Sequence, residues 1–571
     1  MDIFLLALAN IVDPATLLFM VIGVGAGLMA GSIPGFTIAM AVVLTLPFTF
    51  SMPPAQGLAT MISVLVGGLS GGLMSGILTG IPGTPSSVAT TFDGFPMARR
   101  GEAGLALGIG VWSSFCGGII SAALLVLFAP QLAAVGLEFQ PWDFFMLVMF
   151  ALTVTASLAG EHLIKGLIAG AAGLLIRTVG EDDAVGVGRF DFGSDYLLTG
   201  FDFIAVLIGL FAFSQLLSDL RNPVNARKAL SDQKRVEVRI EHRRAIKILM
   251  RHWFDVIRSA LIGMFTGTLP GAGGSIANIL SYDQAKKAAK DDSQFGKGDP
   301  RGIIAPEASN NAVEGGALTP LMALGIPGDI TAAIMLGALL MHDIVPGPTF
   351  ISDEPVLAYS IYIAFFLASF IMLGMQSIVL RVFVLVTRIK AYVLATIILT
   401  FATIGVFALH NSIEDIWTLF FFGLLGFTMR QYGFPLAPMI LGVVLGDIAE
   451  LNLARALAIN SDPMLFITRP WSLFFAIIAI FSTVFPLFQK QRGSGSLLER
   501  LYSPFLLLSL SAPLFMMGGV FRTSLAVLAI FGSGYMLLRH RARGANTANC
   551  SPFPDEFERN AMRQVTLPWL L

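Results

Sequence analysis

Charged residues are scarce in this chain. Asp, Glu, Lys and Arg make up 13% of the 571 residues, against about 25% in soluble domains. Apolar residues make up 55%, and the mean hydropathy is +0.78. A soluble chain of this length has no core large enough for so much apolar surface, so the lipid bilayer is the expected surrounding. Roughly a dozen apolar stretches are long enough to cross it as helices. The sequence therefore predicts an all-α polytopic membrane protein.

Other features are absent too. The two cysteines, Cys116 and Cys550, lie far apart and indicate neither a disulfide framework nor a metal site. A net charge of −1 gives no reason to expect a nucleic-acid partner. The Gly-Asp pairs at 328–329 and 446–447 lack the first glycine of the GxGD motif of intramembrane aspartyl proteases, and HExxH does not occur. We therefore expect that the chain is not an enzyme and has no catalytic residue and no cofactor.

Basic residues divide the chain. The stretch 221–251 carries ten Lys and Arg residues, is too charged to cross lipid, and is predicted to face the cytoplasm. The last residues are polar and lie outside any apolar stretch. The predicted parts are a first transmembrane half (1–220), a basic cytoplasmic linker (221–251), a second transmembrane half (252–491), an extra hydrophobic pair (492–543) and a polar tail (544–571).

The two halves contain the same motifs in the same order. Gly31-Ser-Ile-Pro34-Gly35 recurs 236 residues later as Gly267-Thr-Leu-Pro270-Gly271, and Gly80-Ile-Pro82-Gly83 recurs 245 residues later as Gly325-Ile-Pro327-Gly328. Two ordered pairs at nearly equal offsets indicate an internal duplication. We predict two repeats, each with Pro-Gly-broken re-entrant or discontinuous helices, and an inverted topology between them.

The Pro-Gly breaks are the predicted transport site. Proline removes a helical hydrogen bond, and freed backbone groups survive at membrane depth only inside protein or beside a wet cavity. In secondary transporters such breaks hold the substrate. An isolated break is often only a kink, but four breaks in repeat register favour a site. The predicted substrate-binding residues are the prolines and glycines of the breaks and nearby polar side chains: Pro34, Gly35, Thr37, Pro82, Gly83, Thr84, Ser86, Ser87, Pro270, Gly271, Ser275, Asn278, Pro327, Gly328, Asp329 and Thr331.

One polar group is predicted to couple an ion. Pro306 is placed to begin a helix, on which Glu307, Asn311 and Glu314 would share one face with Asn310 beside them. Carboxylate and amide oxygens that lead into an apolar stretch are typical of a cation site or a proton relay. A solvated first helical turn is the competing interpretation. Asp447, in another apolar run, is a further ionisable candidate.

These same residues resemble a known family, the large permease subunit of the tripartite tricarboxylate transporters. The resemblance rests on IPGTPSSVATTFDGFPMARRGEAGLALG (81–108), LPGAGGSIA (269–277), FGKGDPRGIIAPEASNNAVEGGALTPLMALGIPGDITAAIMLGALL (295–340) and PLAPMILGVVLGDIAELNLARAL (435–457). It extends from the N-terminus to about residue 491.

The resemblance implies a multi-pass protein of the bacterial inner membrane. Such permeases act with a periplasmic solute-binding protein and a small membrane subunit, and they import a tricarboxylate or related carboxylate. The driving force is an ion gradient, of H⁺ or Na⁺, rather than ATP, and the chain has no GxxxxGK[ST] phosphate loop. A channel or an energy-independent facilitator for small organic anions is the alternative function.

The chain departs from the family pattern at Phe36, at Gly80 and at Asp329, where the family usually has leucine, asparagine and serine. All three positions lie at the predicted site. A carboxylate at position 329 would repel an anionic substrate unless it is protonated or bound to a cation. We therefore expect the departures to affect the choice of substrate.

Overall fold

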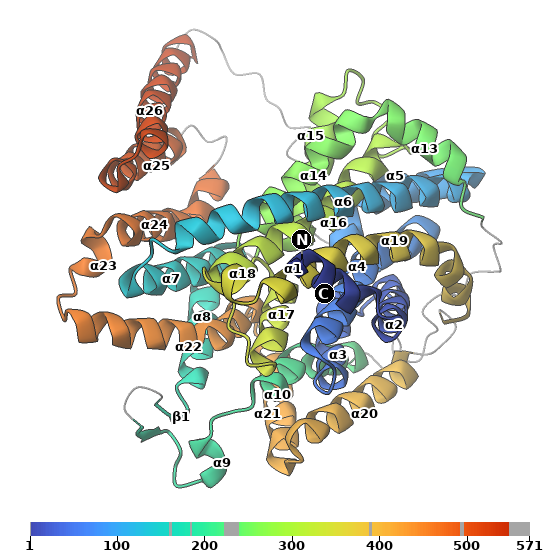
Figure 1. The fold of residues 1–571 in the computed structure, drawn as a ribbon. Coiled ribbons are helices and arrows are strands. Elements are labelled where there is room, and N and C mark those ends of the chain that lie inside the picture. Colours follow the sequence, from blue (N-terminus) through green and yellow to red (C-terminus); the bar gives the residue numbers. More distant parts are fainter. Residues whose placement is uncertain are drawn as a thin grey trace. The chain divides into compact units, whose positions relative to one another are not determined.

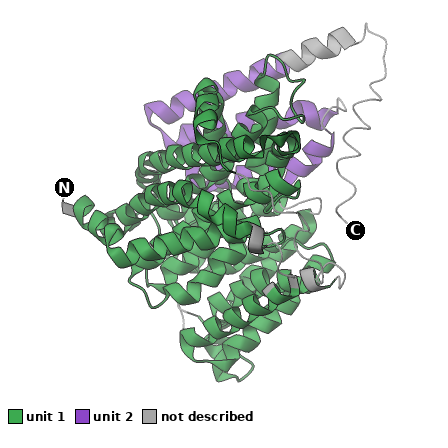
Figure 2. Ribbon diagram, turned by 90° about the vertical axis from the view of Figure 1, so that its right-hand side faces the viewer, with its two compact units in different colours: residues 1–467 green, residues 468–571 purple. Residues whose placement is uncertain are grey.

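The computed structural model describes residues 2–158, 163–182, 186–221, 239–386, 391–491 and 496–547. The chain divides into two compact units, residues 1–467 and 468–571 (Figure 2). Most of the predicted basic linker, residues 222–238, and most of the polar tail lie outside the described residues.

The first unit begins with helices that correspond to the first predicted half (Figure 1). Their bounds are α1 (Asp2–Val12), α2 (Pro14–Ser32), α3 (Ile38–Thr49), α4 (Pro54–Thr79), η1 (Pro85–Ser87), α5 (Val88–Met97), η2 (Ala98–Glu102), α6 (Ala103–Gly136), α7 (Pro141–Leu158), α8 (Leu163–Arg177), α9 (Asp195–Leu198), α10 (Phe203–Ile208), η3 (Gly209–Phe213) and α11 (Ser214–Leu220). Between α8 and α9, the two-residue strands β1 (Gly180–Glu181) and β2 (Gly188–Arg189) pair antiparallel.

Further helices complete this unit and form the second one. They are α13 (His242–Arg251), α14 (Trp253–Gly267), α15 (Gly273–Ala288), α16 (Arg301–Leu324), α17 (Ile330–Met341), α18 (Phe350–Asp353), α19 (Pro355–Val386), α20 (Ala391–His410), α21 (Ile413–Gln431), α22 (Leu436–Ile459) and α23 (Leu465–Thr468). The second unit contains α24 (Pro470–Gln491), α25 (Leu497–Met517) and α26 (Val520–Thr547), with α25 packed against both neighbours.

Helices account for nearly all of the described structure. Nine helical stretches there are long and apolar enough to cross a membrane, and several shorter apolar helices accompany them. Some of the short ones, such as α3 and α17, follow directly on Pro-Gly breaks. The predicted all-α polytopic membrane fold is therefore confirmed.

The duplicated sequence corresponds to duplicated helix crossings. Helix α2 packs along α4, and α14 packs along α16. In both crossings glycines bring the backbones into direct contact, because a Cβ at these glycines would overlap a carbonyl oxygen of the partner helix. The overlapping pairs are Gly27 with Val64, Gly31 with Gly68 and Gly71 with Leu28 in the first crossing, and Gly263 with Ser309, Gly267 with Val313 and Gly316 with Met264 in the second. Each pair recurs at the offsets of the sequence motifs.

The breaks themselves also match. Gly80 and Gly325 end α4 and α16 in the left-handed conformation, with φ of 75° and 73°. Gly35 and Gly271 have φ of 92° and 80°. Because such φ values favour glycine, the repeated glycines are needed for the turn. The inverted orientation of the two repeats, and the boundaries of the halves, stay predictions.

One local prediction was wrong. Pro306 does not begin a helix, because α16 already starts at Arg301. The proline sits in the second turn, where it removes the hydrogen bond to the carbonyl of Gly302. The helix starts earlier because Asp93 accepts hydrogen bonds from the amides of Gly298 and Asp299, just ahead of its first turn. Glu307 is consequently not in a solvated first turn; it is fully buried.

The matched crossings predict matched sensitivity to a methyl group. Gly31→Ala and Gly267→Ala each place a Cβ against backbone that can move only with its whole helix, so we expect each to cost about 1–3 kcal/mol. The measurement is thermal unfolding of the purified protein in detergent. Gly374→Ala is the control, since no atom lies within 4 Å of that position in α19. Equal melting temperatures for Gly267→Ala and the control would contradict the crossing.

Candidate substrate and ion site

Several predicted site residues mainly hold helix ends. The Thr37 hydroxyl accepts a hydrogen bond from the amide of Met40 (3.2 Å) and caps α3. Asp329 caps α17, accepting from the amide of Ala332 (2.7 Å) and the hydroxyl of Thr331 (2.7 Å). Caps of this kind satisfy the free amides at the start of a helix. Contact of these residues with substrate stays a prediction.

Residues 84–87 form a small group of hydroxyls at the second break. The Ser87 hydroxyl donates to the carbonyl of Thr84 (2.9 Å), and the Thr84 and Ser86 hydroxyl oxygens lie 3.1 Å apart. All three side chains are buried. Pro34 is half-buried and Gly35 is exposed, whereas their counterparts Pro270 and Gly271 are buried and half-buried. Pro82 is likewise half-buried, whereas its counterpart Pro327 is buried. The two repeats are therefore not equivalent in their surroundings.

Glu307 connects the two halves. The Thr90 hydroxyl, on α5, donates to its Oε1 (2.5 Å), and the Ser114 hydroxyl, on α6, donates to its Oε2 (2.8 Å). All three residues are buried. Each carboxylate oxygen of Glu307 thus has a donor from the first half of the chain.

Amide side chains make three more contacts between the halves. Asn278 Oδ1 accepts from the amide of Ala89 (2.7 Å). Asn311 Oδ1 accepts from the Ser70 hydroxyl (2.8 Å), and Asn310 Nδ2 donates to the carbonyl of Leu69 (2.9 Å). The asparagines predicted from sequence are therefore brought to one interface, between α4 and α5 on one side and α15 and α16 on the other.

Some buried polar atoms at this interface have no hydrogen-bond partner. They are Asn278 Nδ2, Asn310 Oδ1, Glu314 Oε1 and Gln376 Oε1. Gln376 belongs here because its Nε2 donates to the carbonyl of Ser70 (3.4 Å). An unsatisfied buried group costs about 1–3 kcal/mol, and native proteins keep few of them. A polar ligand, an ion or water is the expected partner of these atoms.

The first turn of α15 faces this interface. The helix starts at Gly273, after Ala272, and no side chain caps it. A Cβ at Gly274 would lie 2.7 Å from Asn310 Oδ1 and 2.8 Å from Ser86 Cβ, and one at Gly273 would lie 3.9 Å from Asp329 Cβ. The uncapped start of α15 therefore lies beside residues from breaks in both halves. Uncapped helix N-termini attract anions.

The space beside Asp329 is small. A cavity of about 10 Å³ is lined by the second-half break, by Thr155 of α7 and by residues of α22. Such a volume accommodates about one water molecule. This conformation therefore leaves no room for a tricarboxylate beside Asp329.

Sequence reasoning missed Asp93, which fixes the loop before α16 to the first half. Besides the two loop amides (2.7 Å each), it accepts from the Tyr282 hydroxyl (2.9 Å). Arg100 donates to the carbonyl of Gly298 (3.2 Å) in the same loop. The partners lie about two hundred residues apart, so no spacing in a single sequence indicates the contact. Ser70, Ser114 and Gln376 were missed for the same reason.

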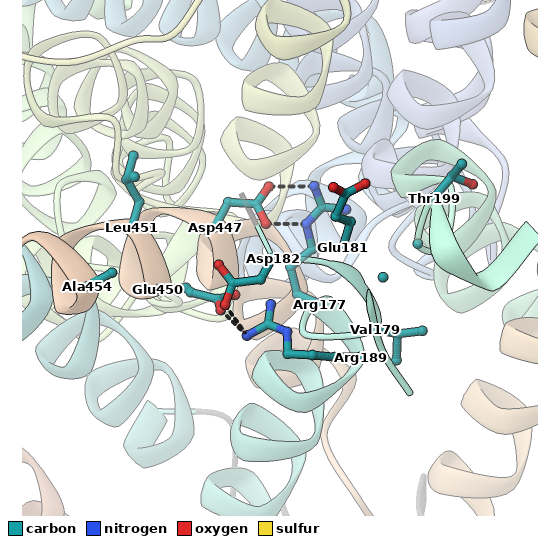
Figure 3. Close-up of a pocket in the computed structure, with 12 residues that line it drawn as sticks. Arg177, Val179, Glu181, Asp182, Arg189, Thr199, Asp447, Glu450, Leu451 and Ala454 are labelled. Atoms are coloured by element: carbon teal, nitrogen blue, oxygen red, sulfur yellow. Dashed lines mark hydrogen bonds and ion pairs between the residues drawn. The ribbon is translucent and has the colours of Figure 1, made fainter. Parts of the chain in front are cut away.

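Asp447 lies elsewhere. Its carboxylate meets the guanidinium of Arg177 in a two-bond pair, with Nη2 and Oδ2 2.5 Å apart (Figure 3). Arg189 similarly pairs with Glu450 and Asp182. These pairs line a polar cavity of about 120 Å³ between α8, the β-hairpin and α22. Nearly half of the Asp447 side chain is exposed, so it is not a buried membrane carboxylate.

Fold and interface together define a polytopic membrane protein of two repeated halves with polar side chains buried between them. Comparison with known families identifies it further: the chain belongs to the tripartite tricarboxylate transporter TctA family, whose model matches residues 17–441. Members of this family are the large subunits of tripartite tricarboxylate transporters.

Two curated relatives come from Agrobacterium vitis. An uncharacterized 52.8 kDa protein in the TAR-I ttuC' 3'region is 31% identical over 468 residues, which cover 80% of this chain and 90% of the relative. An uncharacterized protein in the TAR-II ttuC' 3'region is 32% identical over 209 residues, 36% of this chain and 86% of the relative. No solved structure matches the chain.

The contact between Asn278 and Ala89 predicts a graded response to substitution. Asn278→Ala leaves the buried amide of Ala89 without an acceptor, at about 1–3 kcal/mol, and should lower both the melting temperature and uptake. Asn278→Asp keeps an oxygen at that place and should retain more stability. The measurement is thermal unfolding in detergent beside transport in vesicles. If the alanine variant is as stable as wild type, the contact does not hold the halves together.

Proposed function

We propose that this chain is the large permease subunit of a binding-protein-dependent secondary transporter, which imports a tricarboxylate or related carboxylate on an ion gradient. The observation that carries the proposal is the uncapped start of α15, which faces Ser86 and Asn310 across the interface of the halves. Free helix amides with hydroxyl and amide groups suit a carboxylate and place no fixed charge in the protein interior.

A difference between the two repeats at a helix start supports this assignment. Thr37, which caps α3, corresponds by the repeat offset to Gly273 at the start of α15. A side-chain cap satisfies the helix amides, whereas glycine leaves them for a ligand. We therefore place the substrate carboxylate at α15, with the Ser86 hydroxyl as a side-chain contact.

Three acids favour a coupling ion. In the described part of the chain, the buried Glu307 and Glu314 and the half-buried Asp329 form no ion pair with a Lys, Arg or His side chain. Glu314 also keeps one unpartnered oxygen. Carboxylates at membrane depth are costly unless a cation or a proton neutralises them. We propose that H⁺ or Na⁺ does so during transport, at Asp329 and within the α16 group formed by Glu307, Asn310, Asn311 and Glu314.

The remaining parts of the proposal rest on family membership. The periplasmic solute-binding protein delivers the substrate, the small membrane subunit completes the complex, and the assembly lies in a bacterial inner membrane. The gradient, and not ATP, supplies the energy.

The proposed function is tested by uptake into vesicles that contain the complex, with the binding protein added and H⁺ or Na⁺ gradients imposed separately. We expect accumulation of a carboxylate only with one gradient and only with the binding protein. Equilibration without either would indicate a facilitator or channel and overturn the proposal.

Asp329→Asn should uncouple transport. Asparagine also caps helices, so α17 is expected to stay intact. The substitution removes the ionisable carboxyl group of residue 329. We expect gradient-driven accumulation to fall at least tenfold, while exchange of substrate at equal concentrations continues. Asp353→Asn, at the exposed end of α18, is the control. Undiminished accumulation in Asp329→Asn would exclude this residue from coupling.

Ser86→Ala should weaken substrate binding. It removes a hydroxyl close to the start of α15, and we expect KM for the carboxylate to rise about tenfold, which corresponds to one hydrogen bond to a charged group. Thr91→Val is the matched control on α5, because the Thr91 hydroxyl donates to its own helix at Val88. A KM that rises equally in both variants would show that Ser86 does not contact substrate.

A further inference from the structure

Three metal-ligating side chains meet away from the central site. Asp202 precedes α10, His410 ends α20, and Asp415 lies in the first turn of α21 (Figure 1). His410 Nδ1 is 3.1 Å from Asp415 Oδ2 and 3.8 Å from Asp202 Oδ2. One ligand atom from each residue lies within 4.8 Å of the others.

The remaining oxygen of each carboxylate is already held by a donor. Asp202 Oδ1 accepts from the amide of Ala205 (2.7 Å), and Asp415 Oδ1 accepts from the Tyr196 hydroxyl (3.0 Å). A carboxylate oxygen accepts hydrogen bonds, so the Tyr196 hydroxyl is the donor. This arrangement directs both Oδ2 atoms toward His410. Outer hydrogen bonds of this kind orient the ligands in known metal sites.

The cluster contains two acidic side chains and one basic side chain. Only 14% of the Asp202 side chain and 4% of the Asp415 side chain are exposed. Across the described residues, neither carboxylate forms an ion pair with Lys or Arg, and the imidazole of His410 is the basic group beside both. Two largely buried carboxylates therefore share a single imidazole. The His410 side chain is 53% exposed, which leaves an approach from solvent.

We propose that Asp202, His410 and Asp415 bind a divalent first-row metal ion of the zinc type. Two carboxylate oxygens and one imidazole nitrogen are a known donor set for zinc, with water as the fourth ligand. Ligand distances of about 2.0–2.2 Å require the three atoms, which lie within 4.8 Å of one another, to move closer together. The ion would join the start of α10, and through Tyr196 the segment before it, to the α20–α21 hairpin. The site is independent of the proposed transport function.

Sequence reasoning predicted no metal site here. The histidine and Asp415 are close in the sequence, but Asp202 lies about two hundred residues earlier. No short ligand motif connects them, so only the fold brings the three together.

The experiment is zinc binding by untagged protein in detergent, after removal of metal with a chelator. We expect one Zn²⁺ per wild-type chain and a higher melting temperature with zinc. His410→Ala and Asp415→Asn should bind at least tenfold more weakly. Asp195→Asn, an acidic residue of α9 outside the cluster, should bind as wild type does.

Wild-type protein that binds no more zinc than His410→Ala, or that zinc does not stabilise, overturns the proposal. A second measurement needs no variant. Co²⁺ added to metal-free wild type should give the visible absorption of a four-coordinate ion, which Zn²⁺ then removes. Absence of that absorption at saturating Co²⁺ also overturns the proposal, whether or not the variants fold.

Discussion

The backbone hydrogen bonds released at the Pro-Gly breaks are the constraint on which the fold depends. No lipid group can satisfy them, so the neighbouring helix must. The amide of Gly83 donates to the carbonyl of Gly72 (3.4 Å), and the amide of Gly328 donates to the carbonyl of Ala317 (3.3 Å). Each of these bonds requires the break to pack directly against the helix crossing of its own repeat. A Cβ at Gly83 would overlap the carbonyl oxygen of Gly31, and a Cβ at Gly328 would overlap that of Gly267. The prolines at the breaks free backbone groups, and the glycines at the crossings allow the close packing that satisfies these groups. Both repeats use this combination.

Duplication of the backbone did not duplicate the side chains. Where the first repeat has Thr37, the second has Gly273, and where the first has Thr84, the second has Asp329. The first exchange leaves the start of α15 uncapped. The second places the Cβ atom of Asp329 3.9 Å from the Cβ position of Gly273. The second repeat therefore has both the uncapped helix start and the carboxylate, while the first repeat has hydroxyl groups at the matching positions. The proposed anion and cation sites would lie side by side, which suits coupled transport, because each ligand would reduce the cost of binding the other.

The sequence predicts the general architecture well, since apolar length and repeated Pro-Gly motifs are local signals. It also selected Glu307 and the asparagines of α16, because their helical spacing places them together. It failed where the partner is distant: Pro306 looked like a helix start only because the contact of Asp93 with residues 298–299 was invisible. Asp447 looked like a buried acid because the run around it is apolar, but its partner Arg177 is on another helix. Hydrogen bonds between halves leave no periodicity to detect.

The structure also separates the four ion-coupling candidates by what their oxygens do. Both oxygens of Glu307 accept from hydroxyls of the first half, and Asn311 Oδ1 accepts from Ser70. These atoms hold the halves together and have little capacity left for an ion. Asn310 Oδ1 and Glu314 Oε1, by contrast, are buried and unpartnered. Because an unsatisfied buried oxygen is stabilised most by a cation or proton, the coupling ion on α16 is expected at Asn310 and Glu314, in addition to Asp329. Glu307 is expected to position the helix that carries the first two.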